Sequence, residues 1–512
     1  MTFPPASRRQ FLRQAGALPV LASTAAPFAL NLAALGSAAA QNASGDYKAL
    51  VCVFLFGGND SYNTVLATDT ASWLGYHAAR GGLGTSIALK APGVPPLRSA
   101  APGTPERLGG VLPLAPATGQ TGRSFALHPL LPALQQLFNT DKRLAVLANV
   151  GPLVAPTTKE QLRIHSHPRP PKLYSHNDQQ STWQAFAPEG ASAGWGGRMA
   201  DLLRSANGDQ SLFTSISTSG NAVWLAGERV MQYQVAGSGA IRLGVDAQRR
   251  LFGSAVAGEA LQRIVGKARS GNLMEAAYVE TTRRSIEAER ALGAALGELA
   301  PPYGTPGPDG QPDPLLHYDH PLSGTKAYNP LAQQLQIVAR MVGAASSLGV
   351  RRQVFFVGLG GFDTHDFQSR NHADLMARLS HGLAYFDDVL GAIGARERVT
   401  TFTASDFGRT FTSNGDGTDH GWGAHHFVMG GAVRGGDLYG RFPAYGLSTG
   451  QGEFTSEQQL GNNGALLPEI SVDQYAATLG RWFGLSDSQL LEVLPNLANF
   501  DTARRQLGFM RV

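Results

Sequence analysis

The fold is decided by two stretches of sequence, VFFVGLGGFDTHD (residues 354–366) and VTTFTASDFGRT (residues 399–410). Each begins with a short apolar run rich in β-branched and aromatic residues, which is typical of a buried strand. Each run then gives way to small residues and an aspartate, Asp363 or Asp406. Because α/β sheets collect polar site residues beyond the carboxyl ends of their strands, the pattern predicts an α/β fold with a charged site at that edge.

A third run, YKALVCVFLFGGND (residues 47–60), repeats the arrangement and ends at Asp60. Taken alone, Asp60 is equally a turn residue or a helix N-cap. Another strand is expected at 143–150. Helices with apolar residues three to four apart are expected at 127–138, 330–348 and 371–393. These elements predict a mixed, mostly parallel central sheet sandwiched between helices.

Composition and charge exclude some classes of function. The chain has 512 residues with 62 Gly and 30 Pro, which indicates long ordered loops. Its net charge is +4, and three arginines within residues 1–40, a segment without Asp, Glu or Lys, supply three of these charges; removing them leaves about +1. The basic balance is therefore no argument for nucleic acid as a partner. The single cysteine, Cys52, excludes an intramolecular disulfide and is expected in the core.

The first 40 residues resemble an export signal. SRRQFLR (residues 7–13) matches the twin-arginine motif, a weakly apolar stretch follows at 15–35, and small residues at 37–40 offer cleavage before Gln41. The alternative is a membrane anchor, but Pro19 and Pro27 and the modest hydrophobicity favour cleavage. We therefore expect a periplasmic or secreted protein that meets the twin-arginine translocase and keeps no stable membrane insertion.

The aspartates and histidines at the strand ends predict a metal site. Asp363 and His365 lie two residues apart, so in an extended segment both point to the same side. Asp406 and Asp60 join them if the strands are neighbours, and the later loop contributes imidazoles. Mixed Asp/His ligation suits zinc or manganese, and a carboxylate-rich set also admits magnesium or calcium. Two such ions, roughly 4 Å apart, would clamp a phosphate or sulfate ester. The loop histidines are His420, His425 and His426.

The stretch YSHNDQ (residues 174–179) allows two interpretations. Ser175 with Asp178 three residues later fits a capped helix start. Alternatively, the Ser175 hydroxyl is a nucleophile at a helix N-terminus beside a metal. His176 and Asp178 are ligands in one reading and loop hydrogen-bonding groups in the other. Arg409 is equally an anion-binding residue or part of a structural salt bridge.

Competing chemistries lack their motifs. The glycine pairs at 57–58 and 360–361 have no third spaced glycine before a helix, so they are no dinucleotide fingerprint. A Walker-type phosphate loop and a convincing Gly-x-Ser-x-Gly elbow after a strand are absent from the sequence.

Five motifs carry a family resemblance: FGGND (56–60), YSHNDQ (174–179), GGFDTH (360–365), TASDFGRT (403–410) and DHGWG (419–423). With the export motif, they make the chain resemble the twin-arginine-exported bacterial domain-of-unknown-function family fifteen-oh-one over nearly its whole length. That family is grouped distantly with the alkaline phosphatase and sulfatase superfamily. The resemblance implies a three-layer architecture, a mixed sheet between helices, and a two-metal site.

The resemblance also implies roles for single residues. Asp60 is similar to the superfamily's first metal aspartate, and Asp363 with His365 to the pair on the second metal. Asp406 is similar to the aspartate of the strand-end motif, and His420 or His425 to the late histidine. Ser175 stands where a helix-start nucleophile is expected. The sequence departs from the superfamily at residue 407, a Phe where His or Asn is usual, and in the short spacing between Asp363 and His365.

Two functions follow as hypotheses. The first is an exported metal-dependent hydrolase acting on small phosphate or sulfate esters, with one or two divalent ions (zinc, manganese or calcium), Ser175 and Arg409 as catalytic residues, and no nucleic acid as partner. The second is a non-catalytic envelope binding or assembly protein on the same fold with a partly degenerate metal site. In both, residues 1–40 are the signal peptide, and residues 41–512 form one domain with a helical insertion around 240–300.

Overall fold

The strands predicted from the three apolar runs lie side by side in the middle of one sheet. In the computed structural model, β1 (Lys48–Phe56) pairs in parallel with β11 (Arg352–Gly360) on one side and with β12 (Val399–Ser405) on the other. The register places Phe56 beside Gly360 and Leu55 beside Ser405, so all three strands end at one edge. The prediction that their terminal aspartates lie at the same edge of a sheet is confirmed.

The structure describes residues 47–82, 86–164, 166–237, 239–240, 250–265, 272–305, 307 and 311–511. The predicted signal peptide, 1–40, lies outside these residues. Residues 46 to 512 make one compact unit. Each helix of the described part is too short or too polar to cross a membrane.

The central sheet is mixed and mostly parallel, as predicted. Its order is β14-β5-β13-β12-β1-β11-β6-β7-β8, with β17 also beside β5. Only the pairs β12–β13, β13–β5 and β7–β8 of this sheet are antiparallel among the described residues. The outer strands are β5 (Leu144–Gly151), β6 (Ser215–Ser217), β7 (Tyr233–Ala236), β8 (Gly239–Ala240), β13 (Ala424–Met429), β14 (Leu438–Tyr439) and β17 (Ile470–Ser471).

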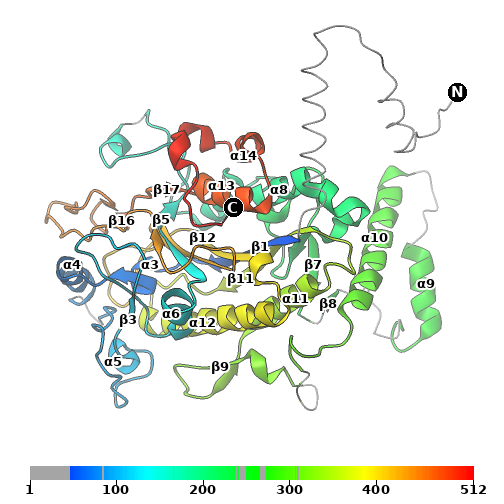
Figure 1. Ribbon diagram of the computed structural model, residues 1–512, viewed down its shortest axis with the longest axis horizontal. Helices are drawn as coiled ribbons and strands as arrows, with labels where there is room; N and C mark the ends of the chain where they lie inside the picture. The colour runs from blue at the N-terminus through cyan, green and yellow to red at the C-terminus, as the bar shows by residue number, and fades with distance from the viewer. Residues whose placement is uncertain are drawn as a thin grey trace, which may run out of the picture. The chain divides into compact units, whose positions relative to one another are not determined.

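Helices cover both faces of this sheet, which makes three layers (Figure 1). On β1, Val51 and Val53 belong to the core cluster on one face, whereas Cys52 and Phe54 belong to the cluster on the other. This alternation follows from the two-residue period of a strand, and burial on both faces explains the unbroken apolar run. The first face packs against α6 (Pro132–Asn139), α11 (Pro330–Gly343) and α12 (Gln368–Ala392), which lie below the sheet in Figure 1. The second packs against α8 (Trp195–Leu203) and α13 (Val472–Phe483), which lie above it.

The remaining elements surround these layers. The helical insertion expected around 240–300 contains two helices in its described part. The other elements are α3 (Ser61–Thr64), β2 (Val65–Ala67), α4 (Thr70–Arg80), α5 (Pro105–Leu108), β3 (Leu112–Leu114), β4 (Phe125–Leu127), α7 (His176–Ala185), α9 (Ala255–Val265), α10 (Leu273–Leu296), β9 (His317–Asp319), β10 (Lys326–Tyr328), β15 (Gln459–Leu460), β16 (Ala465–Leu466) and α14 (Asp487–Val493).

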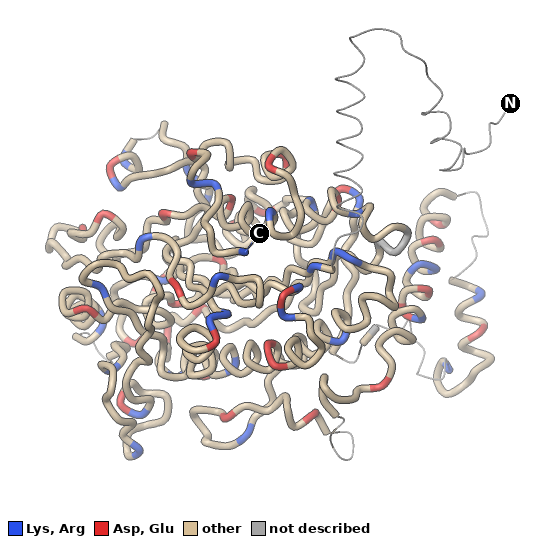
Figure 2. Tube along the Cα trace, viewed as in Figure 1, with Lys and Arg blue, Asp and Glu red and all other residues tan. Residues whose placement is uncertain are grey.

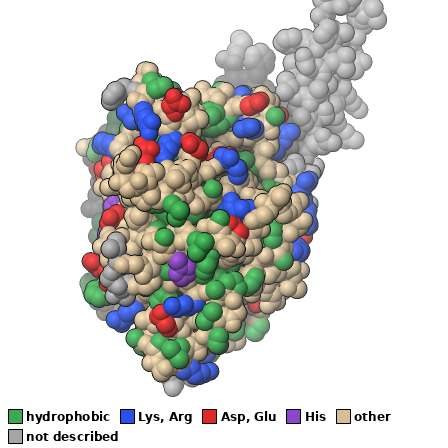
Figure 3. Space-filling model, turned by 90° about the vertical axis from the view of Figure 1, so that its left-hand side faces the viewer, with side chains coloured by type: hydrophobic (Ala, Val, Ile, Leu, Met, Phe, Trp, Pro, Cys, Tyr) green, Lys and Arg blue, Asp and Glu red, His purple; other side chains and the backbone are tan. Residues whose placement is uncertain are grey.

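Acidic and basic residues are interspersed along the described chain (Figure 2). The same mixture is visible on the face at the left of Figure 1 (Figure 3). A nucleic-acid interface needs a coherent basic surface, whereas the face drawn in Figure 3 carries charges of both signs.

Candidate metal centre

The site is built on two sharp turns that follow β1 and β11. Gly57 has φ +113°, and a Cβ placed there would lie 2.3 Å from the backbone nitrogen of Asp363. Only glycine therefore lets the turn after β1 approach the turn that carries Asp363. The Gly57 N–H also donates to the Asp406 carboxylate at 3.2 Å. This packing brings together three segments that are distant in the sequence.

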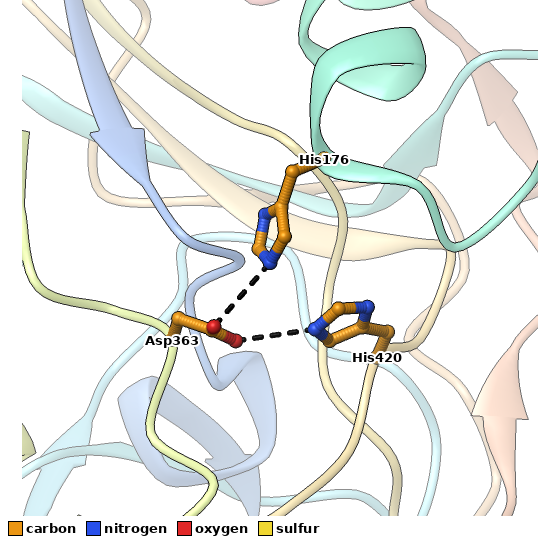
Figure 4. A group of neighbouring side chains, drawn as sticks. All are labelled: His176, Asp363 and His420. Atoms are coloured by element: carbon orange, nitrogen blue, oxygen red, sulfur yellow. Dashed lines mark hydrogen bonds and ion pairs between the residues drawn. The ribbon is translucent and has the colours of Figure 1, made fainter.

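Three side chains from different elements meet at this edge (Figure 4). His176 at the start of α7, Asp363 after β11 and His420 in the loop before β13 each offer one ligand atom, and these atoms all lie within 4.8 Å of one another. Asp363 Oδ2 is 3.4 Å from His176 Nε2, and Asp363 Oδ1 is 3.2 Å from His420 Nε2. His365 approaches the same place, because its Nε2 is 3.2 Å from Asp363 Oδ1 and 3.0 Å from His420 Nε2.

The other ring nitrogen of each histidine faces a hydrogen-bond acceptor. His176 Nδ1 lies 2.7 Å from Asp406 Oδ2, and His365 Nδ1 lies 3.1 Å from Asp419 Oδ1. His420 Nδ1 lies 2.8 Å from the backbone carbonyl of residue 174. An acceptor at Nδ1 holds the proton there and leaves the Nε2 lone pair free, which is the usual arrangement around histidines that bind metal. With the proton held at Nδ1, all three rings would have an Nε2 lone pair free for a cation beside Asp363.

The charges of the site favour a bound cation. Burial works to raise the pKa of Asp363, but the hydrogen bond and charge of Arg409 outweigh it and hold this pKa below its usual value. Burial lowers the pKa of the His420 ring. The hydrogen bond with Asp406 raises the pKa of His176. At neutral pH, Asp363 is thus ionised and His420 is neutral, which are the forms that bind a cation. His176 takes up a proton more readily as pH falls, and a cation would have to displace that proton.

Asp60, predicted as a ligand, is instead paired inside the protein. Its side chain and that of Arg80 are both 0% exposed, and they make a two-pronged ion pair with N–O distances of 2.5 and 2.9 Å. The amide of Gln368 and the backbone N–H of Tyr62 donate to the same carboxylate. The prediction is corrected because every Asp60 oxygen already has a donor. The carboxylate is neutralised by an arginine rather than by a metal.

Asp406 and His425 also lie elsewhere than predicted. Asp406 is fully buried behind the His176 ring and accepts a further bond from the Gln180 side chain at 2.8 Å, so its oxygens have internal partners and one of them orients that ring. His425 lies within β13, where its ring packs on Phe442 at 4.4 Å and its Nδ1 accepts from the Asn149 N–H. Burial lowers the pKa of His425 to about 3, so it is a neutral core residue.

The two predicted catalytic residues have internal partners as well. Ser175 is the N-cap residue of α7, but its hydroxyl makes no capping bond to the backbone and instead donates to the Asp178 carboxylate at 2.8 Å. The Arg409 side chain is 0% exposed and donates to Asp363 at 2.7 Å, to the Gly57 carbonyl and to Thr418. Arg409 is therefore a buried support of Asp363 and is not available to an incoming anion.

A continuous set of hydrogen bonds nevertheless joins the three strand-end aspartates. Gln368 donates to Asp60 and accepts from Thr418 at 2.6 Å, and Thr418 accepts from Arg409, which holds Asp363. His176 bridges Asp363 to Asp406. The predicted convergence of residues 60, 363 and 406 is therefore present, with an arginine and a histidine between the carboxylates.

Sequence reasoning left His176 undecided and missed Arg80. The signal for His176 was its position at the first turn of a predicted helix, which places a side chain at the sheet edge. Arg80 is the last residue of α4 and had no distinguishing pattern, because an arginine at a helix end is ordinarily a solvated residue that favours the helix dipole.

Residues 47–494 match the family described as "Protein of unknown function (DUF1501)", and the chain belongs to this family. The curated proteins include none that matches the chain. The identification agrees with the resemblance carried by the five motifs.

Several solved structures resemble the chain weakly. One is the crystal structure of Ps i-CgsB in complex with k-i-k-neocarrahexaose (9% identity, 89% of this chain and 77% of that chain, TM-score 0.33). Another is the PsFucS1 sulfatase from Pseudoalteromonas sp. (10% identity, 93% and 76%, TM-score 0.32). A third is the phosphonate monoester hydrolase SpPMH from Silicibacter pomeroyi (9% identity, 70% and 69%, TM-score 0.29). At these TM-scores the similarity carries no argument about activity, which must come from the site itself.

Proposed function

We propose that the protein is an exported metal-dependent hydrolase of phosphate or sulfate esters. The observation that supports this most is the convergence of three imidazole Nε2 atoms on the Asp363 carboxylate, each ring held at Nδ1 by an acceptor. His176, Asp363 and His420 would supply two nitrogens and one oxygen and leave a fourth position for water, with His365 beside them. This nitrogen-rich set favours zinc or another transition metal over calcium, which prefers oxygen ligands. We therefore propose one nitrogen-rich ion in place of the predicted pair.

The exposure of the cluster fits a catalytic rather than a purely structural site. The Asp363 and His365 side chains are 43% and 40% exposed, so one side of the cluster is open to solvent. Structural zinc sites are closed by four protein ligands, whereas catalytic sites keep a position accessible. A bound divalent ion would supply polarisation of the ester oxygens and lower the pKa of a water molecule. Since Ser175 is bonded to Asp178, we propose that water is the nucleophile.

The residues of the chain have supporting roles in this proposal. Arg409 orients Asp363, and Asp406 and Asp419 orient the rings of His176 and His365. Rigid orientation of the ligands fixes where an ester must bind and excludes unproductive geometries. The substrate we propose is a small anionic ester. The interspersed surface charges give no support for a nucleic acid (Figures 2 and 3). The periplasmic or secreted location and the twin-arginine route rest on the sequence motif.

Metal analysis of the purified mature protein tests the site. We expect about one equivalent of zinc in the wild type and a loss of it in His420→Ala and Asp363→Asn. His317→Ala, a half-buried histidine on β9, is the matched control and should keep the metal. A folded wild type that binds no transition metal, or retention of full metal by both site variants, would reject the proposal.

A second function is favoured by one observation. Phe407 packs its ring against His176 at 4.8 Å and against His420 at 4.5 Å, so an apolar side chain occupies a position where the superfamily resembled here carries a ligand. On this basis, the alternative is a non-catalytic envelope binding or assembly protein that retains the metal. Turnover of aryl phosphate and aryl sulfate esters by the zinc-loaded wild type, lost in His420→Ala, would favour the hydrolase. Metal retention without any turnover would favour the alternative.

A further inference from the structure

Two partly exposed aromatic residues lie in the segments that carry histidines of the candidate metal centre. Tyr174 is 42% exposed and precedes His176 by two residues, and Phe367 is 63% exposed and follows His365 by two residues. The backbone of each residue makes a hydrogen bond to the loop before β13, which carries His420. The Tyr174 carbonyl faces His420 Nδ1, and the Phe367 N–H donates to Asp416 at 3.1 Å.

Both residues also have an unfavourable backbone conformation. The φ angle is +73° at Tyr174 and +52° at Phe367, in the left-handed region that bulky side chains rarely adopt. Phe367 is in addition the N-cap of α12, where it can make no side-chain capping bond. Ser, Thr, Asp, Asn or Gly would serve the fold better at that position.

Each ring buries less apolar area than an aromatic ring of the core. An aromatic ring contributes to stability chiefly through the apolar area that it buries, and these rings remain substantially in water. Strained residues persist where the surrounding structure holds them, and they concentrate at sites that bind ligands. Exposed aromatic rings offer a flat apolar surface on which another ring packs. These residues lie two positions from histidines of the candidate metal centre. Their rings therefore suit contact with the alcohol portion of an ester whose phosphate or sulfate is held at that centre.

We propose that Tyr174 and Phe367 select esters whose alcohol is a ring with an apolar face, either aromatic or a pyranose. This inference rests on the proposed function, because the metal centre is what would hold the phosphate or sulfate group. The two rings then determine specificity and take no part in the reaction at the anion.

Calorimetric binding of non-hydrolysable anions to the zinc-loaded protein tests the inference. We expect phenylphosphonate to bind the wild type at least about tenfold more tightly than methylphosphonate, from the usual contribution of aromatic pairs. Phe367→Gly and Tyr174→Gly should each reduce this ratio about three- to tenfold. Both variants should keep their zinc and their melting temperature, since glycine adopts positive φ without strain. Phe367→Tyr should restore the ratio because it restores the ring.

Phe252→Gly is the matched control. Phe252 is 98% exposed and has φ +50°, but it lies in the segment before α9, distant in sequence from every proposed ligand. Its replacement should leave the ratio unchanged. The same measurement with a non-hydrolysable pyranosyl phosphonate against methylphosphonate distinguishes a pyranose from an aryl ring, and a preference lost in the glycine variants supports the inference in either case.

The outcomes separate this inference from the function on which it rests. Equal binding of both phosphonates by the wild type, or a ratio that survives in both glycine variants, would overturn the role of the rings and leave the metal centre standing. If the zinc-loaded wild type binds neither phosphonate, the anion site and the ring surface are both rejected.

Discussion

Replacement of Asp60 by Asn distinguishes a structural aspartate from a metal ligand. In the structure, Asp60 and Arg80 are both fully buried, and the pair makes two N–O contacts at 2.5 and 2.9 Å. Asn removes the charge and one acceptor, so the Arg80 guanidinium stays buried without its counter-ion. Breaking a buried ion pair in this way costs about 3–5 kcal/mol. Arg80 keeps its hydrogen bonds to the Thr410 and Phe411 carbonyls. We therefore expect the loss in unfolding free energy to lie at the lower end of that range.

The assay has two parts. Urea unfolding of chelator-treated Asp60→Asn should show a midpoint well below that of the wild type, because loss of the ion pair acts without any metal. Zinc analysis of the folded variant should still give about one equivalent per chain. A double variant, Asp60→Leu with Arg80→Met, should recover most of the lost stability, since it leaves no unpaired charge in the core.

One result would refute this reasoning. If Asp60→Asn unfolds at the wild-type urea concentration and yet has lost its zinc, Asp60 is a ligand and the ion pair is incidental. Asp363→Asn gives the reference behaviour for a ligand, namely loss of metal, together with a smaller loss of stability in the metal-free protein, because it leaves the buried Arg409 without a carboxylate that is itself 43% exposed.

The other predictions concern single substitutions. Asp406→Asn should weaken zinc affinity about 10–100-fold in a chelator competition, because it removes the charged acceptor that orients a ligand ring. His425→Phe should leave zinc affinity unchanged in that competition, and a loss would return this residue to the site. Gly57→Ala should lower stability by more than about 2 kcal/mol in urea unfolding, since φ is +113° and the added Cβ would lie 2.3 Å from a backbone nitrogen. Burial raises the pKa of Asp473 to about 7. Its protonated form therefore stabilises the fold fully below about pH 4, and this contribution is lost as pH rises through 7, so Asp473→Asn should gain up to about 4 kcal/mol over the wild type at pH 8 and almost nothing at pH 4. A gain that is equal at both pH values would contradict that titration.

The sequence was sufficient to predict the central strands and the edge at which the site lies. Apolar runs buried on both faces have an unmistakable pattern, and the residue that follows such a run must lie at the sheet's rim. Phe56 and Gly360 prove to be neighbours in register for this reason. The helices α11 and α12 were predicted equally well, because their apolar spacing reflects one packed face.

The partners of the charged residues were beyond the reach of the sequence. Asp60, Asp363 and Asp406 have the same local setting, an aspartate after a strand, and their roles differ only through tertiary neighbours. Arg80 reaches Asp60 from 20 positions away, and His176 reaches Asp406 from 230 positions away. Pairings at such separations leave no periodic signal in the sequence. The sequence therefore could not distinguish the ion-paired Asp60 from Asp406, which accepts from a histidine, or from Asp363, which faces the candidate metal position.

The place of β1 has a consequence for how the polypeptide matures. The earliest strand of the described chain occupies the centre of the sheet, and its two neighbours are made about 300 to 350 residues later, as the pairing of Lys48 with Arg352 and Ala49 with Val399 shows. Contacts this distant in sequence form slowly, because a very long loop must close before they bring any gain. During synthesis, β1 therefore remains without both of its partners until most of the polypeptide has left the ribosome. Any product that terminates before β12 leaves one flank of this apolar strand bare and prone to aggregation.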